Sequence, residues 1–305
     1  MTNKIFKTIH RHFSALLRSA KPIRASAANK VVYNYIDISE WQGTVDFAKV
    51  KASGIQGIII RIGYGDVISY PYQIDKQFER NYSECKRLGI PVGAYFYCYA
   101  TTVAEAQREA QGCLKLITGK QFELPILYDV EEQSVFSKGY CNEVIKAFAD
   151  ILEAAKWWVG IYSYKCAADA YFTERTKTRY TMAIAQYASV CTYTGPYAIW
   201  QNSSTTSVPG ISGRVDHDWC YEDFPTEIKA KGKNGYTAPS TDTRIETTQD
   251  SDILKGTASA PPVVACVGKG NQYTIDKTVK VGAYTFGHIK GTGDRWINLK
   301  TCKTV

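Results

Sequence analysis

The sequence lacks any long uninterrupted run of apolar residues. A membrane-spanning helix needs roughly 18 or more such residues in succession, and no window of this 305-residue chain approaches that composition. The first thirty residues also lack acids, although they carry Lys and Arg at seven positions. A secretory signal would need an apolar stretch of about 7 to 15 residues there, and Arg18 and Lys21 interrupt the only candidate. We therefore expect a basic arm over residues 1–30, no cleaved signal peptide and no membrane span.

Paired cysteine motifs are absent as well. The nine cysteines are odd in number and contain no CxxC pair, which argues against a disulfide framework or a zinc site and for reduced, buried thiols. We expect neither a metal nor a cofactor. Basic clusters interleaved with aromatics are also missing, so a nucleic-acid partner is not expected. The net charge of +8 fits an anionic polymer as partner without selecting one.

Strand-length apolar segments alternate with stretches of helical period in the first two-thirds of the chain. Segments of the first kind are rich in Ile, Val, Tyr and Phe, and those of the second repeat apolar residues three and four positions apart. The expected strands cover residues 31–39, 57–64, 91–99, 123–131, 158–164, 181–187, 197–203 and 215–221. The expected helices cover residues 45–53, 75–88, 103–117 and 140–156, with a short one near 166–172.

This alternation predicts the α/β class, with parallel strands covered by helices. Eight strands in this length favour an irregular TIM-like (β/α) barrel with fewer helices than strands, because the later connections are too short or too polar for full helices. A doubly wound open sheet is the alternative. The barrel domain is expected over residues 31–224.

The composition changes after the barrel. Residues 225–262 are rich in Lys, Gly, Thr, Ser, Asp and Pro, and this range is typical of a linker. Residues 263–305 return to alternating apolar residues punctuated by glycines. We expect a small all-β module there, near the lower size limit for independent folding.

Acidic residues end several of the apolar segments. Asp37 ends the first, Asp129 and Glu131 end the fourth, and Asp216 lies in the last. Functional groups of a parallel barrel collect at the carboxyl ends of its strands, and side chains two apart on a strand share a face. Two such acids in a partly dry site cannot both ionise easily, so one can serve as the acid of glycoside cleavage. An ordinary loop entrance with solvated acids is the alternative, and the acids on other strands count against it.

Several motifs, in matching order, resemble glycoside hydrolase family 25, which comprises muramidases of bacteria, fungi and phages. The resemblance covers roughly residues 31–224. The motifs are YIDISEWQGTVD at 35–46, LGIPVGAYFY at 88–97, YDVE at 128–131, WQN at 200–202 and VPGISGRVDHD at 208–218.

The resemblance implies cleavage of the β-1,4 bond between N-acetylmuramic acid and N-acetylglucosamine in bacterial peptidoglycan. By resemblance, Glu131 is the acid and base, and Asp129 is its partner and orients the substrate's 2-acetamido group. Asp37 and Asp216 are the acids of the first and last strands, with Asp218 a rival to Asp216. A phage-type relative would stay in the cytoplasm until released to the wall; secretion by an unrecognised route is the alternative.

Aromatic residues near the strand ends are candidate sugar platforms, because rings stack on pyranose faces. The expected substrate-binding set is Tyr64, Tyr95, Tyr97, Tyr162, Trp200 and Gln201. Packing inside the barrel is the alternative for each ring.

The tail resembles a bacterial SH3-type wall-binding module in its WINL sequence at 296–299, and a structural appendage is the alternative. For the whole protein, the alternatives to a peptidoglycan hydrolase are a catalytically inactive wall-binding protein and a hydrolase of a related polymer such as chitin. The oligomeric state is left open.

Overall fold

The computed structural model describes residues 33–237, 242–256 and 262–305. The basic arm expected over residues 1–30 lies outside this range. The chain divides into two compact units, with the boundary between residues 238 and 239, and each unit is described by itself.

The first unit is a closed eight-stranded barrel in the order β1 to β8. Strands β1 to β7 run parallel, whereas β8 is antiparallel to both β7 and β1. The predicted irregular barrel is confirmed, and the open-sheet alternative is wrong. The strand bounds lie within three residues of the expected ones: β1 Tyr33–Ile38, β2 Gly57–Tyr64, β3 Val92–Tyr97, β4 Ile126–Asp129, β5 Val159–Tyr164, β6 Thr181–Ala185, β7 Ile199–Thr206 and β8 Val215–Cys220.

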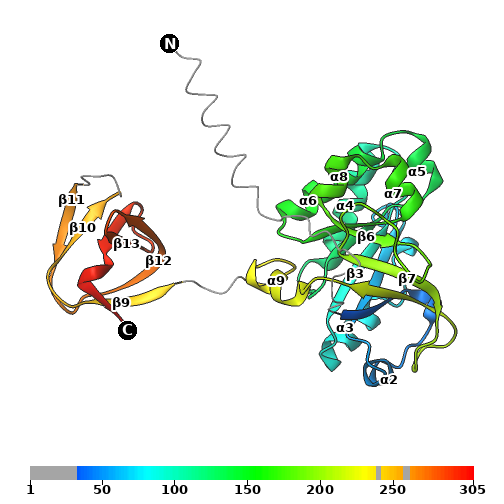
Figure 1. Cartoon of the computed structure of the whole chain (residues 1–305), viewed down its shortest axis with the longest axis horizontal. Coiled ribbons are helices and arrows are strands. Elements are labelled where there is room, and N and C mark those ends of the chain that lie inside the picture. The colour runs from blue at the N-terminus through cyan, green and yellow to red at the C-terminus, as the bar shows by residue number, and fades with distance from the viewer. Residues whose placement is uncertain (1–32, 238–241, 257–261) are drawn as a thin grey trace, which may run out of the picture. The chain divides into compact units, whose positions relative to one another are not determined.

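Helices cover the outside of the barrel between the early strands (Figure 1). In the described residues no helix separates β6 from β7 or β7 from β8, as the short polar connections predict. Isoleucine and valine side chains of the outer strand faces pack against the helices in one large core. The helices are α2 Phe47–Ala52, α3 Phe78–Leu88, α4 Val103–Ile117, α5 Gln133–Ser137, α6 Cys141–Ala154, α7 Lys165–Tyr171 and α8 Glu174–Arg179, with short 3-10 turns η1 Glu40–Gln42 and η2 Pro71–Gln73.

A second core fills the barrel interior below the carboxyl ends of the strands. It contains Tyr35, Ile59 and Leu127, all buried. Gly57 allows this packing, because an added Cβ there would lie 2.6 Å from the Tyr35 ring. The interior is therefore a packed layer of side chains, on which the polar residues of the upper barrel rest.

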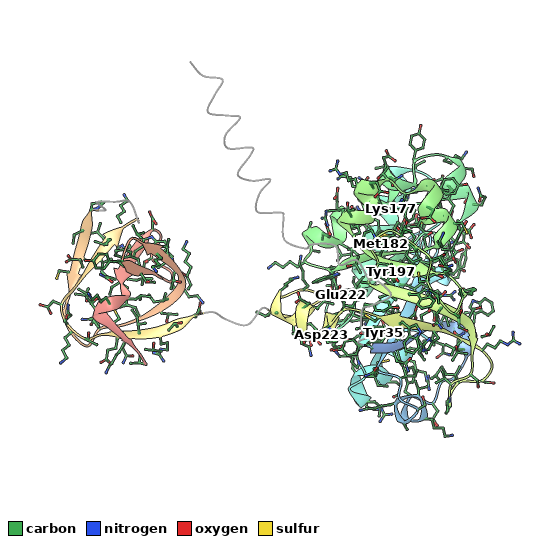
Figure 2. All side chains as sticks on the ribbon, viewed as in Figure 1. Tyr35, Lys177, Met182, Tyr197, Glu222 and Asp223 are labelled. Carbon is green, nitrogen blue, oxygen red and sulfur yellow. The ribbon has the colours of Figure 1, made fainter. Side chains whose placement is uncertain are left out.

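Helix α9 (Phe224–Ala230) belongs to the barrel and corrects the expected boundary at residue 224. Its Phe224 and Ile228 are buried in the interior core. Figure 2 shows Tyr35 and Asp223 close together at the end of the barrel where α9 begins. The helix is short and follows a polar strand, so its two apolar contacts gave too little periodic pattern to distinguish it from a linker.

Asn234 closes the same end of the barrel and is fully buried. Its amide Nδ2 donates to Leu124 O at 2.8 Å, and its Oδ1 accepts from Trp158 N at 2.6 Å. Its backbone N donates to Lys156 O and its carbonyl accepts from Phe122 N, both at 3.1 Å. The backbone is left-handed, with φ 53°, a conformation that Asn tolerates better than most residues. Residues up to 236 are thus structural parts of the barrel.

The second unit is a seven-stranded antiparallel sheet in the order β11-β10-β14-β13-β12-β9-β15. Two of its strands lie in the range expected to be a linker, and their Ile245 and Ile253 join the core of the unit. Each short strand contributes few apolar residues, which explains why composition alone concealed them. The elements are β9 Thr243–Thr247, β10 Ser251–Lys255, β11 Val263–Val267, β12 Gln272–Val281, β13 Tyr284–Ile289, β14 Arg295–Asn298, η3 Leu299–Thr301 and β15 Cys302–Thr304.

Two general features of the described residues bear on the sequence-based expectations. No helix among them is both long and apolar enough to span a membrane. All nine cysteines fall within the described ranges and are free thiols, five of them buried, at positions 85, 98, 113, 141 and 220.

Candidate active site

Five acids gather at one end of the barrel. Asp37 lies near the end of β1, and Asp129 is the last residue of β4. Asp216 and Asp218 lie on β8, whose antiparallel direction places Asp216 in register with Asp37. Glu131 follows β4 by two residues. The reversed last strand therefore brings its first residues to the carboxyl ends of the other strands, as the expected acid cluster requires.

Asp129 is 5% exposed, and its Oδ1 has no hydrogen-bond partner among the described residues. Burial raises its pKa well above the ordinary value, and the charge of Glu131 raises it further. The Arg61 guanidinium acts in the opposite direction. Asp129 and Glu131 thus interact directly in electrostatic terms, as two acids on one face of an extended segment should.

Glu131 is partly exposed. Burial raises its pKa, while the Tyr97 hydroxyl beside it lowers it and the neighbouring charges of Glu132 and Asp216 raise it. The single proton of that hydroxyl is donated to Glu132 Oε1 at 2.8 Å. A carboxyl with a raised pKa that solvent can reach is suited to give a proton to a bound substrate and to recover it.

The acids of β8 differ in accessibility. Asp218 is 2% exposed, and burial, followed by the charge of Asp216, raises its pKa to about 7. Asp216 is partly exposed, with a pKa raised by burial. Burial, then Asp218 and Asp216, raises the pKa of Asp37. Of the two acids on β8, Asp216 is therefore the one that a ligand can reach more easily.

Gln201 on β7 links the acids to two tyrosines. Its Nε2 donates to Asp37 Oδ2 at 2.7 Å. Its Oε1 accepts from the hydroxyls of Tyr162 at 2.9 Å and Tyr187 at 3.0 Å. The amide orientation is fixed by these partners, since the oxygen must face the hydroxyls and the nitrogen the carboxylate. The network holds Asp37 in place.

Tyrosines line the same end of the barrel. Tyr64 and Tyr97 lie in register on β2 and β3, and both rings contact the ring of Tyr99, with centroids 5.7 and 5.2 Å away. Tyr95 lies deeper, where burial and the charge of Asp37 raise its pKa. The structure therefore brings Tyr64, Tyr95, Tyr97 and Tyr162 to the acid cluster.

Trp200 does not join this group, which corrects the prediction that it is a sugar platform. It is 7% exposed and packs in the outer core between strands and helices. Its indole Nε1 donates to Gln186 O at 2.9 Å. Gln201 points into the barrel, so strand alternation sends the preceding residue to the opposite face.

Sequence reasoning missed Arg61, Tyr187 and Glu132. Arg61 forms ion pairs with Glu40 at 2.8 Å and Asp75 at 2.7 Å, which hold its charge near Asp129. A lone arginine in the apolar strand Gly57–Tyr64 was the available signal, because a charge in such a strand needs buried partners. Tyr187 and Glu132 lie beyond the ends of β6 and β4, where strand alternation no longer shows which way a side chain points.

Two further observations concern metal binding and a second hollow on the barrel. Among the residues in the structure, no group of three or more His, Cys, Asp and Glu side chains is arranged to hold a metal ion. A hollow of about 520 Å³ near Lys120, Trp157 and Gly235 lies at the amino end of the barrel. It is therefore separate from the acids.

A barrel of mainly parallel strands with a pair of interacting carboxylic acids at the carboxyl ends of those strands fits the class of glycoside hydrolases. Residues 36–211 match the family model described as glycosyl hydrolases family 25. The chain belongs to this family.

Three similar proteins agree with this family assignment. The autolytic lysozyme of Clostridium acetobutylicum is 30% identical over 184 residues, which are 60% of this chain and 54% of that protein. The structure of the modular autolysin LytC from Streptococcus pneumoniae is 29% identical, with a TM-score of 0.55 over 61% of this chain and 46% of that one. LytC has also been solved with a synthetic peptidoglycan ligand. The CTP1L endolysin is 28% identical, with a TM-score of 0.57 over 65% of this chain and 70% of that one. The chain spans about half the length of the first two relatives.

Proposed function

We propose that this protein is a peptidoglycan hydrolase that cleaves the β-1,4 bond between N-acetylmuramic acid and N-acetylglucosamine. The observation that carries the proposal is the pair Asp129 and Glu131, two interacting acids with raised pKa values beside accessible tyrosines. Membership of family 25 and similarity to an autolytic lysozyme support it.

In the proposed reaction, Glu131 protonates the leaving glycosidic oxygen as the bond to the anomeric carbon breaks. The carbonyl oxygen of the substrate's own 2-acetamido group attacks that carbon, and Asp129 orients the group and stabilises the charge it develops. Water then opens the cyclic intermediate while Glu131 takes a proton back. Asp37 and Asp216 hold the sugar, and Tyr64, Tyr95, Tyr97 and Tyr162 supply ring faces and hydroxyls.

The second unit is proposed to bind the wall. Its core of five isoleucines is separate from the barrel, and aromatic side chains such as the half-exposed Tyr284 remain available at its surface. Such a unit would keep the enzyme on an insoluble substrate and raise its local concentration there.

The experiment is clearing of purified bacterial walls by the native chain and by Glu131→Gln. Loss of the proton donor should reduce the rate at least about 100-fold without lowering the melting temperature. Glu143→Gln, at an exposed acid of α6, is the matched control and should clear walls normally.

Equal clearing by the native chain and Glu131→Gln would contradict the assignment of the acid. No clearing by the native chain would favour the inactive wall-binding alternative. New reducing ends on muramic acid are expected among the products. Reducing ends on N-acetylglucosamine would show cleavage of the other glycosidic bond of the wall glycan, and cleavage of chitin instead of walls would favour the related-polymer alternative.

A further inference from the structure

A second polar pocket lies beside the acid cluster. It has a volume of about 360 Å³, and its walls come from the segments that follow β2 and β3, including Asp66, Tyr70, Gln73, Tyr99, Glu105 and Arg108. Both segments leave the carboxyl ends of their strands, so the pocket opens at the same end of the barrel as the proposed reaction.

Tyr99 connects this pocket to the acids. Its half-exposed ring lines the pocket and contacts the rings of Tyr64 and Tyr97. Gly65, at the pocket wall, donates its backbone N–H to Tyr97 O at 3.2 Å. Tyr97 in turn donates to Glu132, next to Glu131. A substrate with a sugar at the acids could therefore place a substituent in the pocket.

Arg108 is the cationic group of the pocket. Its side chain is 51% exposed and forms one ion pair, with Asp66 at 3.4 Å, and no hydrogen bond to any residue that the structure describes. A guanidinium has five N–H donors in a planar fork that matches a carboxylate. Most of this donor capacity is free for a ligand.

Hydrogen-bond acceptors also line the pocket. The Oε1 atom of Gln73 is buried without a hydrogen-bond partner among the described residues, and an acceptor left in this way is costly unless a ligand satisfies it. Asp66 and Glu105 have pKa values lowered by hydrogen bonds from Ser69 and from Thr101 and Thr102. Burial opposes this shift at both acids.

From this arrangement we propose that the pocket binds the peptide substituent of the wall glycan. Arg108 takes a peptide carboxylate, and Gln73 accepts from a peptide N–H. The inference rests on the proposed function for its substrate and adds that peptide-bearing glycan, rather than bare glycan, is the preferred form. A phosphate polymer has no N–H donor for Gln73, Asp66 and Glu105, whereas a bare sugar has no carboxylate for Arg108.

The first test compares hydrolysis of two substrates, intact walls and the same walls stripped of peptide by an amidase. Arg108→Ala should lower kcat/KM on intact walls roughly tenfold, the effect of one charge-assisted hydrogen bond, and leave stripped glycan unaffected. Arg108→Lys should recover part of the loss. Arg175→Ala, at an exposed arginine of α8, should change neither rate. Equal losses on both substrates, or no loss on either, would overturn the proposal.

The second test measures binding and does not depend on turnover. With Glu131→Gln as the protein, calorimetry should show N-acetylmuramoyl-L-alanyl-D-glutamate binding roughly tenfold more tightly than N-acetylmuramic acid. Adding Arg108→Ala or Gln73→Met should remove that difference. If this result holds although the native chain fails to hydrolyse walls, the proposed function fails and the peptide site stands. If both ligands bind equally, the peptide site is wrong whatever the hydrolysis result.

Discussion

At Glu131, burial and three neighbours act on one proton. Burial raises the pKa of its carboxyl, the Tyr97 hydroxyl lowers it, and the charges of Glu132 and Asp216 raise it. Because the proposed acid must be protonated in the free enzyme, kcat/KM falls as pH rises through this pKa. The position of that falling limb is therefore set partly by a residue that does not transfer the proton.

Replacing Glu132 by Gln should move the falling limb to lower pH. The substitution removes a negative charge that favours the protonated form of Glu131, so the pKa of Glu131 decreases and the acid is lost earlier as pH rises. The measurement is kcat/KM on a soluble glycan from pH 4 to pH 9. A limb that stays in place would show that Glu132 does not influence the acid; the exposed-acid variant Glu143→Gln should show the parental profile.

A single site residue could be predicted from the sequence only where its position depends on one strand and not on contacts between distant segments. Asp129 and Glu131 follow from strand alternation, because two positions on one face need no knowledge of other strands. The same rule could have excluded Trp200 once Gln201 was placed inside. Arg108 and Gln73 could not be predicted, since helix α4 and the 3-10 turn η2, which carry them, meet only in the folded barrel.

Among the elements, the eight barrel strands were predictable because each is a compact run of β-branched and aromatic residues between turn residues. Helix α9 and strands β9 and β10 were not. Each presents two or fewer buried apolar anchors within a polar stretch, so local sequence carries little signal and the tertiary contacts determine the element.

The turn around Asn234 is expected to stabilise the barrel strongly. Asn234→Gly keeps the left-handed backbone but leaves Trp158 N–H and Leu124 C=O unsatisfied, which should lower the free energy of unfolding by about 2–4 kcal/mol. Asn234→Ala should cost about 1 kcal/mol more because of its positive φ. Urea denaturation measures both effects. Lys156→Gly, at an exposed residue of similar φ, is the control and should not destabilise; an unchanged midpoint for Asn234→Gly would contradict the bridging role.

For the whole molecule, the boundary at residues 238 and 239 can be tested by truncation. A chain ending at 237 should melt cooperatively and cleave soluble glycan at the parental rate, but sediment with walls much less than the full chain. A chain ending at 223 should fail to fold, because removing Phe224 and Ile228 empties buried sites that are worth about 2–5 kcal/mol each. Circular dichroism and wall sedimentation provide the readouts. A stable chain ending at 223 would show that the barrel domain does end near residue 224, as first expected. If the chain ending at 237 sediments with walls as well as the full chain does, the second unit does not bind the wall.

The packed interior beneath the acids restricts the route by which water and product can reach or leave the site. Tyr35, Leu127 and Phe224 pack inside the barrel and Asn234 is buried at its far end, so these described side chains separate the acids from that end. In the proposed reaction, the water that completes hydrolysis must then enter at the same end of the barrel from which the cleaved sugar departs. The leaving half of the glycan therefore has to depart before water can enter.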